Sequence, residues 1–326
     1  MPRLTERQLG AAQQKATQMA ATETSHGRLP VGDEIFLDHV AHFVADADAT
    51  VRALAQAGFA PTPVSADVNP NPGGGPPQPT GTGNVTAMLD RGYIECLFTT
   101  ADTPLAKQLK VAMARYRGLH LVAFAVADAT ATHARLAEIG FHLEPLVDMQ
   151  RPVETADGQA VAAFSIVRLA PGAMPEGHIQ ALTHRTEQTM WQQHWLSHPN
   201  SAVALLDAVI VEPNVGDAAA RFQRFLGRRA EFDRYGQSVT LDRGRVQLIS
   251  STMLNQLLPG LEIPAFPFIC TYGVAVRSLG AVASCLEAAG VSFERRKDCV
   301  IAPFPPPLGD GCWAFVEDAA ALPWRA

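Results

Sequence analysis

Two short apolar stretches of the chain carry histidines where an expected strand leads into a helix. Residues Phe36–Asp48 have the sequence FLDHVAHFVADAD and contain His39 and His42, and residues Gly118–Ala129 have the sequence GLHLVAFAVADA and contain His120. A histidine in such a strand can ligate a metal ion through a ring nitrogen or transfer a proton near neutral pH. A strand histidine is also commonly a hydrogen-bonded core residue, so the surrounding elements must decide between these interpretations.

The two stretches belong to a unit that recurs four times. Each copy opens with a strand, continues with a helix and reaches a glycine, a residue type that commonly ends helices. Each copy closes with a strand after another glycine, and one or two further strands are expected in between. The unit is therefore βαβββ, which predicts an α+β fold of four modules. The expected opening strands are Leu37–Val44, Leu119–Val126, Leu206–Val211 and Tyr272–Val276, and the closing strands follow Gly92, Gly177, Gly244 and Gly311.

This repeat divides the chain into four parts. Residues 1–32 are expected to form a helical N-terminal extension, and residues 33–186 hold the first two modules. Residues 187–202 are expected to be a linker, and residues 203–326 hold the last two modules. The Pro/Gly-rich stretch 61–83 is expected as a long loop, which is either a lid over a cavity or a plain surface loop.

Composition narrows the classes of function. Hydrophobic residues make up 47% of the 326 residues and charged residues 18%, which is typical of a folded globular protein. A formal net charge of -6 argues against nucleic-acid binding, because phosphates need a basic surface. No apolar run of about 20 residues suggests a membrane span. The five scattered cysteines without a CxxC pair favour reduced thiols in a cytoplasmic protein. A small-molecule substrate is the expected partner, and the sequence leaves open whether the chain forms a homodimer.

Paired βαβββ modules with a histidine on the opening strand and a carboxylate on the closing strand resemble the vicinal oxygen chelate superfamily. The segments Leu37–Val40, Gly81–Asn84 and Gly92–Glu95 resemble its glyoxalase-like domain branch. The resemblance implies that the modules pair into two half-open barrels. It also implies a divalent metal ion inside a barrel, held by residues of the first and fourth strands of each module.

Carried onto this chain, the resemblance implies a metal site in the first half. His39 and Glu95 occupy the first-strand and fourth-strand ligand positions of module one, and His120 is the first-strand candidate of module two. The fourth-strand position of module two holds Gln180, and His178 is an additional candidate ligand on the same strand face. His120 lies one residue out of phase, so a β-bulge is needed to turn it towards the site. No catalytic residue is assigned.

The same alignment makes predictions for the remaining strand positions. Tyr93 and Arg245 match His178, and Tyr93 and His178 are predicted to bind substrate. In modules three and four the first-strand positions are expected at Ala208 and Thr271, and the fourth-strand positions are expected at Gln247 and Ala314. These residues are poor ligands, so the second half is expected to be metal-free.

Two imidazoles and one carboxylate suit Fe(II), Mn(II), Ni(II) or Zn(II), and Fe(II) is favoured. Three protein ligands and a four-module chain favour a dioxygenase that acts on an aromatic or oxo-acid substrate through vicinal oxygens. Two alternatives stay open: a lyase or isomerase of glyoxalase type, and a non-catalytic protein that binds a small molecule.

Overall fold

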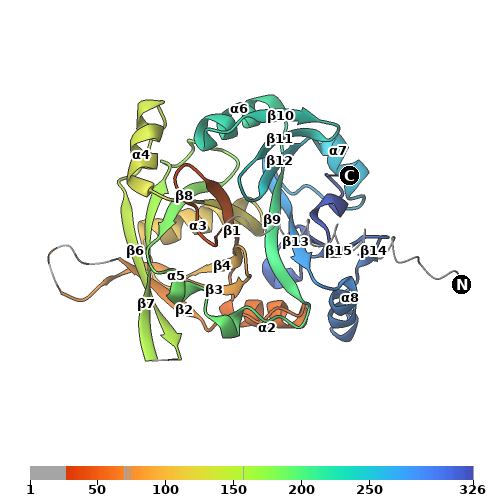
Figure 1. Cartoon of the computed structure of the whole chain (residues 1–326), viewed down its shortest axis with the longest axis horizontal. Helices are drawn as coiled ribbons and strands as arrows, with labels where there is room; N and C mark the ends of the chain where they lie inside the picture. Colours follow the sequence, from red (N-terminus) through yellow and green to blue (C-terminus); the bar gives the residue numbers. More distant parts are fainter. Residues whose placement is uncertain (1–26, 70, 72, 74, 157, 326) are drawn as a thin grey trace, which may run out of the picture.

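The computed structural model describes residues 27–325 except residues 70, 72, 74 and 157. Most of the N-terminal extension expected at residues 1–32 therefore lies outside the described residues. The described chain has the α+β fold that the repeat predicted, with four βαβββ modules paired into two barrels (Figure 1).

The first two modules curl into a barrel. The strands follow the order β1-β4-β3-β2-β6-β7-β8-β5, and β1 also pairs antiparallel with β5. In each module the opening strand pairs parallel with the closing strand, so the two strands expected to carry the site lie side by side. The strands are β1 Ile35–Phe43, β2 Ser65–Asn69, β3 Gln78–Met88, β4 Tyr93–Thr99, β5 Gly118–Val126, β6 Val147–Thr155, β7 Gly158–Arg168 and β8 His178–His184.

Modules three and four form a second, more open barrel. Its strand order is β10-β11-β12-β9-β13-β16-β15-β14, and a single residue pair, Leu119 with Ile269, connects β5 to β13. The strands are β9 Ala202–Val211, β10 Ala230–Asp233, β11 Gly236–Thr240, β12 Arg245–Ile249, β13 Phe268–Val276, β14 Glu294–Arg295, β15 Cys299–Pro303 and β16 Cys312–Val316.

The four module helices start from equivalent capping residues. In each helix the side chain before the first turn accepts a hydrogen bond from a backbone N–H three residues later, which satisfies one of the free amides of that turn. The caps and helices are Asp46 with α2 Ala47–Gln56, Asp128 with α4 Ala129–Glu138, Asn214 with α6 Val215–Leu226, and Ser278 with α8 Leu279–Ala288.

The remaining helices lie between modules or at their ends. The α-helices are α3 Pro104–Arg115, α5 Glu187–Met190 and α7 Ser251–Leu257, and the 3-10 helices are η1 Gln193–Trp195, η2 Pro306–Leu308 and η3 Ala319–Ala321. Among the described residues, no helix combines the length and the apolar character that crossing a membrane requires. All five cysteines are free thiols.

Stretch 61–83, which we expected to be a long loop, is largely a β-hairpin. Strand β2 begins at Ser65, and β3 begins at Gln78, so only the residues between Asn69 and Gln78 connect them. Threonines and a valine are good strand formers, whereas the sequence between the two strands is rich in proline and glycine. The prediction of a long loop was therefore wrong for the 11 residues of this stretch that lie in β2 and β3.

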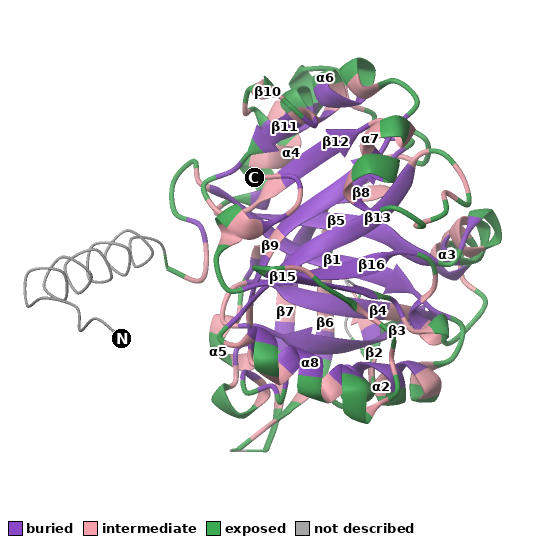
Figure 2. Ribbon diagram, turned by 90° about the vertical axis from the view of Figure 1, so that its right-hand side faces the viewer, coloured by how far each residue is buried: buried purple, intermediate pink, exposed green. Residues whose placement is uncertain are grey.

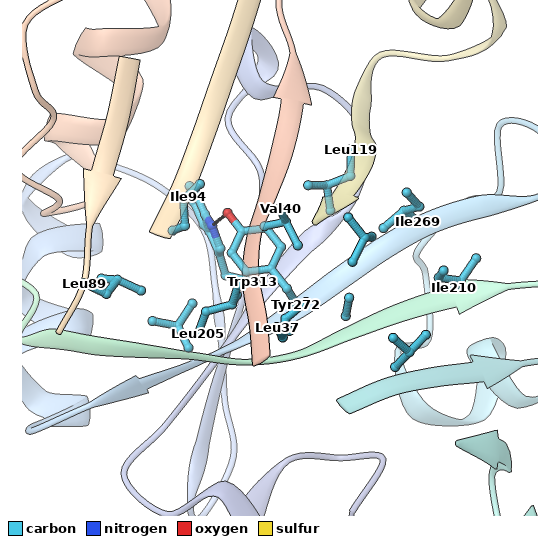
Figure 3. Close-up of a cluster of buried hydrophobic side chains, with 14 of the residues drawn as sticks. Leu37, Val40, Leu89, Ile94, Leu119, Leu205, Ile210, Ile269, Tyr272 and Trp313 are labelled. Carbon is cyan, nitrogen blue, oxygen red and sulfur yellow. Dashed lines mark hydrogen bonds between the residues drawn. The ribbon is translucent and has the colours of Figure 1, made fainter. Parts of the chain in front are cut away.

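The two barrels pack against each other through their outer faces. Figure 2 shows the buried strands at the centre and exposed helices around them, and Figure 3 shows side chains of both barrels meeting in one core. Val40 and Ile94 of the first barrel lie in the same buried cluster as Leu205 and Trp313 of the second. This leaves the concave interior of each barrel as the place for a site.

The interior of the second barrel is filled by its own side chains. Leu254 of α7 and Leu322 and Trp324 near the C-terminus are buried there against Val209 and Phe268. The first barrel instead keeps a large cavity, described below.

Candidate functional site

Two β-bulges set which residues of the first barrel face inwards. In the β1–β5 ladder Leu37 pairs with Phe124 and His39 with Ala123, so Asp38 is the extra residue on β1. Further along, Ala41 pairs with Leu121 and His42 with Leu119, so the extra residue on β5 is His120. The bulge that the sequence analysis required at His120 is therefore present.

The closing-strand glycines show which positions are equivalent between modules. A Cβ atom on Gly92 would lie 2.7 Å from the backbone oxygen of Asp38, and one on Gly177 would lie 2.7 Å from that of His120. His120 therefore corresponds to Asp38, and the equivalent of His39 is Leu121, which pairs with His178 as His39 pairs with Tyr93.

In the second barrel the same register corrects the position expected at Ala208. Asp207 pairs with Arg245 as His39 pairs with Tyr93, so Asp207 is the first-strand residue of module three. Its carboxylate accepts hydrogen bonds from the Trp324 indole at 2.8 Å and from Nε of Arg325 at 2.7 Å. Both of its oxygens are thus engaged by the C-terminal segment. Thr271, Gln247 and Ala314 stand where the sequence alignment put them.

His39 lies inside the first barrel with one ring nitrogen engaged and the other free. Its Nδ1 donates a hydrogen bond of 2.8 Å to Oδ2 of Asp38, since a carboxylate can only accept. Its Nε2 is buried, has no hydrogen-bond partner among the described residues, and lies 3.5 Å from Oε2 of Glu95. The Tyr93 ring stacks on the imidazole, with centroids 4.4 Å apart. Nε2 thus lies beside a carboxylate without a hydrogen bond to it.

Asp38 fixes the orientation of the His39 ring through this hydrogen bond. It is fully buried, and its second oxygen accepts a hydrogen bond of 2.9 Å from Nε2 of His184. Burial alone would raise the pKa of Asp38, but the attraction and hydrogen bonds of His184 and His39 outweigh it and hold the pKa well below its usual range. An ionised Asp38 keeps the proton of His39 on Nδ1, the arrangement seen behind metal-bound histidines.

Glu95 is oriented by an amide that connects it to a buried arginine. Nδ2 of Asn84 donates 2.8 Å to Oε1 of Glu95, and Oδ1 of Asn84 accepts 2.6 Å from Nη1 of Arg151. Asp67 lies beside this chain and accepts 3.0 Å from the Thr82 hydroxyl. Burial and the negative charge of Glu95 raise the pKa of Asp67 to about 7.

A cavity of about 720 Å³ opens from this site, within the size range of small-molecule pockets. Glu95 and Gln180 line both this cavity and a small adjoining one of about 30 Å³ that contacts His39. Helix α3 covers one wall with apolar residues such as Leu105 and Leu109. The site therefore combines a polar inner end with a mainly apolar body.

His120 and His178 line the large cavity at a distance from His39. Nε2 of His120 donates 2.8 Å to the backbone oxygen of Tyr116, and its ring stacks on that tyrosine. Burial lowers the pKa of both His120 and His178 to about 4, so both are neutral at pH 7. Phe43 contacts both rings, with centroids 5.3 and 5.1 Å away. His42 points to the opposite face, into the core between the barrels.

The structure thus brings together part of the predicted ligand set. His39 and Glu95 face each other, and Gln180 shares the same small cavity. His120 does not join them: across residues 27–325, with the gaps noted above, no group of three or more His, Cys, Asp and Glu side chains could hold a metal ion. Gln180 is not one of these four residue types, and its amide oxygen is a further potential ligand beside His39 and Glu95.

The donor set of His39 and Glu95 fits a divalent cation. A neutral imidazole lone pair and a carboxylate repel each other at 3.5 Å unless a proton or a cation lies between them. Bonds of about 2.1 Å from a metal to nitrogen or oxygen allow two ligand atoms to lie up to about 4.2 Å apart, so His39 and Glu95 fit. Fixation of His39 by Asp38 also fits.

Several residues of this site escaped the sequence analysis. Asp38 points inwards because of a bulge, which the alternation of a regular strand hides. Asn84 lies in a segment that carried the family resemblance, yet its bonds to Glu95 and Arg151 depend on tertiary packing. Asp67 lies in β2, within the stretch that we expected to be a loop.

The barrel of paired βαβββ modules, with its inward histidine and carboxylate, defines a protein of the vicinal oxygen chelate superfamily. A family model described as a glyoxalase-like domain matches residues 37–226, more than half of the chain, and the chain belongs to that family. No curated protein sequence matches it.

Solved structures share the fold at low sequence identity. A hypothetical protein from Staphylococcus aureus has a TM-score of 0.57 and 8% identity and covers 86% of this chain and 98% of its own. A mutant of 4-hydroxymandelate synthase from Streptomyces coelicolor has a TM-score of 0.50 and 14% identity, with coverage of 87% and 92%. A fusion of a xylose isomerase-like TIM barrel with 4-hydroxyphenylpyruvate dioxygenase has a TM-score of 0.52 and 11% identity, with coverage of 94% and 54%. At these identities the likeness is one of fold.

Proposed function

We propose that the chain is a metal-dependent enzyme acting on a small molecule that chelates the metal through vicinal oxygens. The observation that carries the proposal is the unpartnered Nε2 of His39, fixed by Asp38 and directed at Glu95 beside a large cavity. We assign the ligands to His39, Glu95 and Gln180. Gln180 replaces His120 because it occupies the strand position equivalent to Glu95 and lines the same small cavity.

The residues of the site prepare it for such a substrate. Asp38 keeps the Nε2 lone pair of His39 available, and Asn84 orients the Glu95 carboxylate. A divalent cation held there would act as a Lewis acid on the chelating oxygens of the substrate. The apolar walls lower the local dielectric constant, which strengthens electrostatic contacts at the polar end.

We assign the reaction to the Fe(II)-type dioxygenase class, with an aromatic or oxo-acid substrate. Three nitrogen and oxygen ligands leave positions on iron for both a chelating substrate and dioxygen. The four-module chain and the cavity of about 720 Å³ support this assignment.

One observation favours a second candidate, a lyase or isomerase of glyoxalase type. The carboxyl group of Asp67 lines the cavity beside Glu95, in a position to accept a proton from a bound substrate. Thr82 and Asn84 hold it in place at 3.0 and 3.4 Å. Proton transfer to and from a positioned carboxyl is the central step of such an isomerisation.

Substrate turnover by protein purified without oxygen and loaded with Fe(II) tests these assignments. Oxygen consumption with a panel of catechols and aromatic 2-oxo acids is expected, and it should be lost in Glu95→Gln but kept in the surface variant Asp102→Asn. Turnover of 2-oxoaldehyde–thiol adducts without oxygen uptake would favour the second candidate. Ligand binding without turnover of either class would show a non-catalytic binding protein and refute both.

A further inference from the structure

Arg168 is a charged side chain on the cavity wall that the ligand set does not use. It is the last residue of β7, and it pairs across the sheet with Gln180 of β8. Its neighbour Val167 belongs to the core between the barrels, whereas Ile166 belongs to the inner face. By alternation Arg168 faces inwards, and it lines the cavity of about 720 Å³.

The guanidinium of Arg168 has no partner in the described part of the chain. It makes no hydrogen bond there, and no carboxylate oxygen lies within 4.0 Å of it; Glu144, Asp67 and Glu95 act on it only through space. Burial lowers its pKa from 12.5, which marks an environment that disfavours the charge. An arginine is nonetheless always protonated in a protein, so a cation stands on this wall.

Other shielded arginines of the chain are engaged. Arg151 donates to Asn84, Arg221 is paired with Glu176, and Arg245 donates to Gln247. A partly buried charge costs free energy unless it is paired, so an unpaired guanidinium that faces a cavity is a site for an anion. Its planar fork of N–H donors matches a carboxylate through two parallel hydrogen bonds.

We propose that Arg168 binds a carboxylate of the substrate, so that the cavity selects organic acids with an apolar body. The apolar body lies along the walls formed by residues such as Leu97, Leu109 and Met149. The inference rests on the proposed function in taking this cavity as the substrate site, but it does not require the metal.

Ligand-observed NMR titrations can measure this selectivity with matched probes. The probes are 4-phenylbutanoate and 4-phenylbutanamide, which have the same shape and differ in charge. Each is titrated into the protein as purified and again with EDTA present, so that a carboxylate bound by a metal is distinguished from one bound by Arg168. The variants are Arg168→Met and Arg168→Gln, with Lys107→Met as a control that removes an exposed cation from the wall of the same cavity.

The acid is expected to bind the wild-type protein about ten- to a hundredfold more tightly than the amide, with or without EDTA. Both Arg168 variants should lose that preference while binding the amide as before, and Lys107→Met should keep it. Equal binding of acid and amide by the wild-type protein, binding of neither, or a preference that survives in both Arg168 variants would overturn the proposal. A preference that disappears only with EDTA would also overturn it, while supporting the metal site. A preference that persists in a protein with no metal affinity would support Arg168 and refute the proposed function.

Discussion

Replacement of His42 by glutamine should reduce the acid sensitivity of the fold. His42 is fully buried between the two barrels. In its neutral form both ring nitrogens have hydrogen-bond partners. Its Nδ1 donates 2.9 Å to the backbone oxygen of Leu308, and its Nε2 accepts 3.1 Å from the Tyr272 hydroxyl. That hydroxyl in turn accepts 2.6 Å from the Trp313 indole. A proton on Nε2 would break this chain of hydrogen bonds.

The magnitude follows from the pKa of His42, which burial lowers from 6.5 to about 4. Because the folded-state pKa lies below the unfolded one, the unfolded state binds the extra proton between these values, and stability falls as the pH drops through this window. Between pH 7 and pH 4.5 the wild-type protein should lose about 2.5 kcal/mol more free energy of unfolding than His42→Gln does.

Urea denaturation at both pH values, followed by tryptophan fluorescence, measures this difference. All other titrating groups are common to the two proteins, so their contributions cancel. Tyr272→Phe is a useful comparison, since it keeps the imidazole but removes the hydroxyl that stabilises the neutral form; its acid sensitivity should lie between those of the other two proteins. Equal losses in wild type and His42→Gln would refute the account of this histidine.

Three further predictions concern the site and its frame. Asp38→Asn should weaken Mn(II) binding about ten- to a hundredfold in a calorimetric titration, because the carboxylate that keeps the proton of His39 on Nδ1 is then missing. Gln180→Ala should weaken Mn(II) binding by about tenfold, whereas His120→Ala should leave the Mn(II) affinity unchanged. A loss of affinity in His120→Ala but not in Gln180→Ala would instead identify His120 as the third ligand. Gly92→Ala should destabilise the fold in urea by more than about 1 kcal/mol beyond Gly140→Ala, since both have positive φ but only Gly92 would place a Cβ 2.7 Å from a backbone oxygen.

The sequence predicted the fold because each module carries local signals of its own. The capping residues Asp46 and Asp128 and the glycines after each helix recur at similar spacing, and they act within a few residues. His39 and Glu95 came together because the opening and closing strands of a module pair in parallel. Such features depend on local chemistry and on topology, both of which repeats reveal.

The rest of the site depends on tertiary register. The sequence showed one extra residue near His120. It could not show that Asp38 is bulged as well, so that the bulged residues Asp38 and His120 occupy equivalent positions in the two modules. Arg168 pairs with Gln180 across the sheet and has no ionic partner in the described part of the chain, and both features follow from packing over long sequence distances. No pattern within a strand encodes those contacts.

We propose above that His39 and Glu95 hold a divalent metal ion in the first barrel. The most direct test is an anomalous difference map from crystals grown with Mn(II), recorded at a wavelength where manganese scatters anomalously. A peak is expected within bonding distance of Nε2 of His39, Oε2 of Glu95 and the side chain of Gln180. A map without a peak there, from protein that shows no stoichiometric Mn(II) binding in solution, would contradict it.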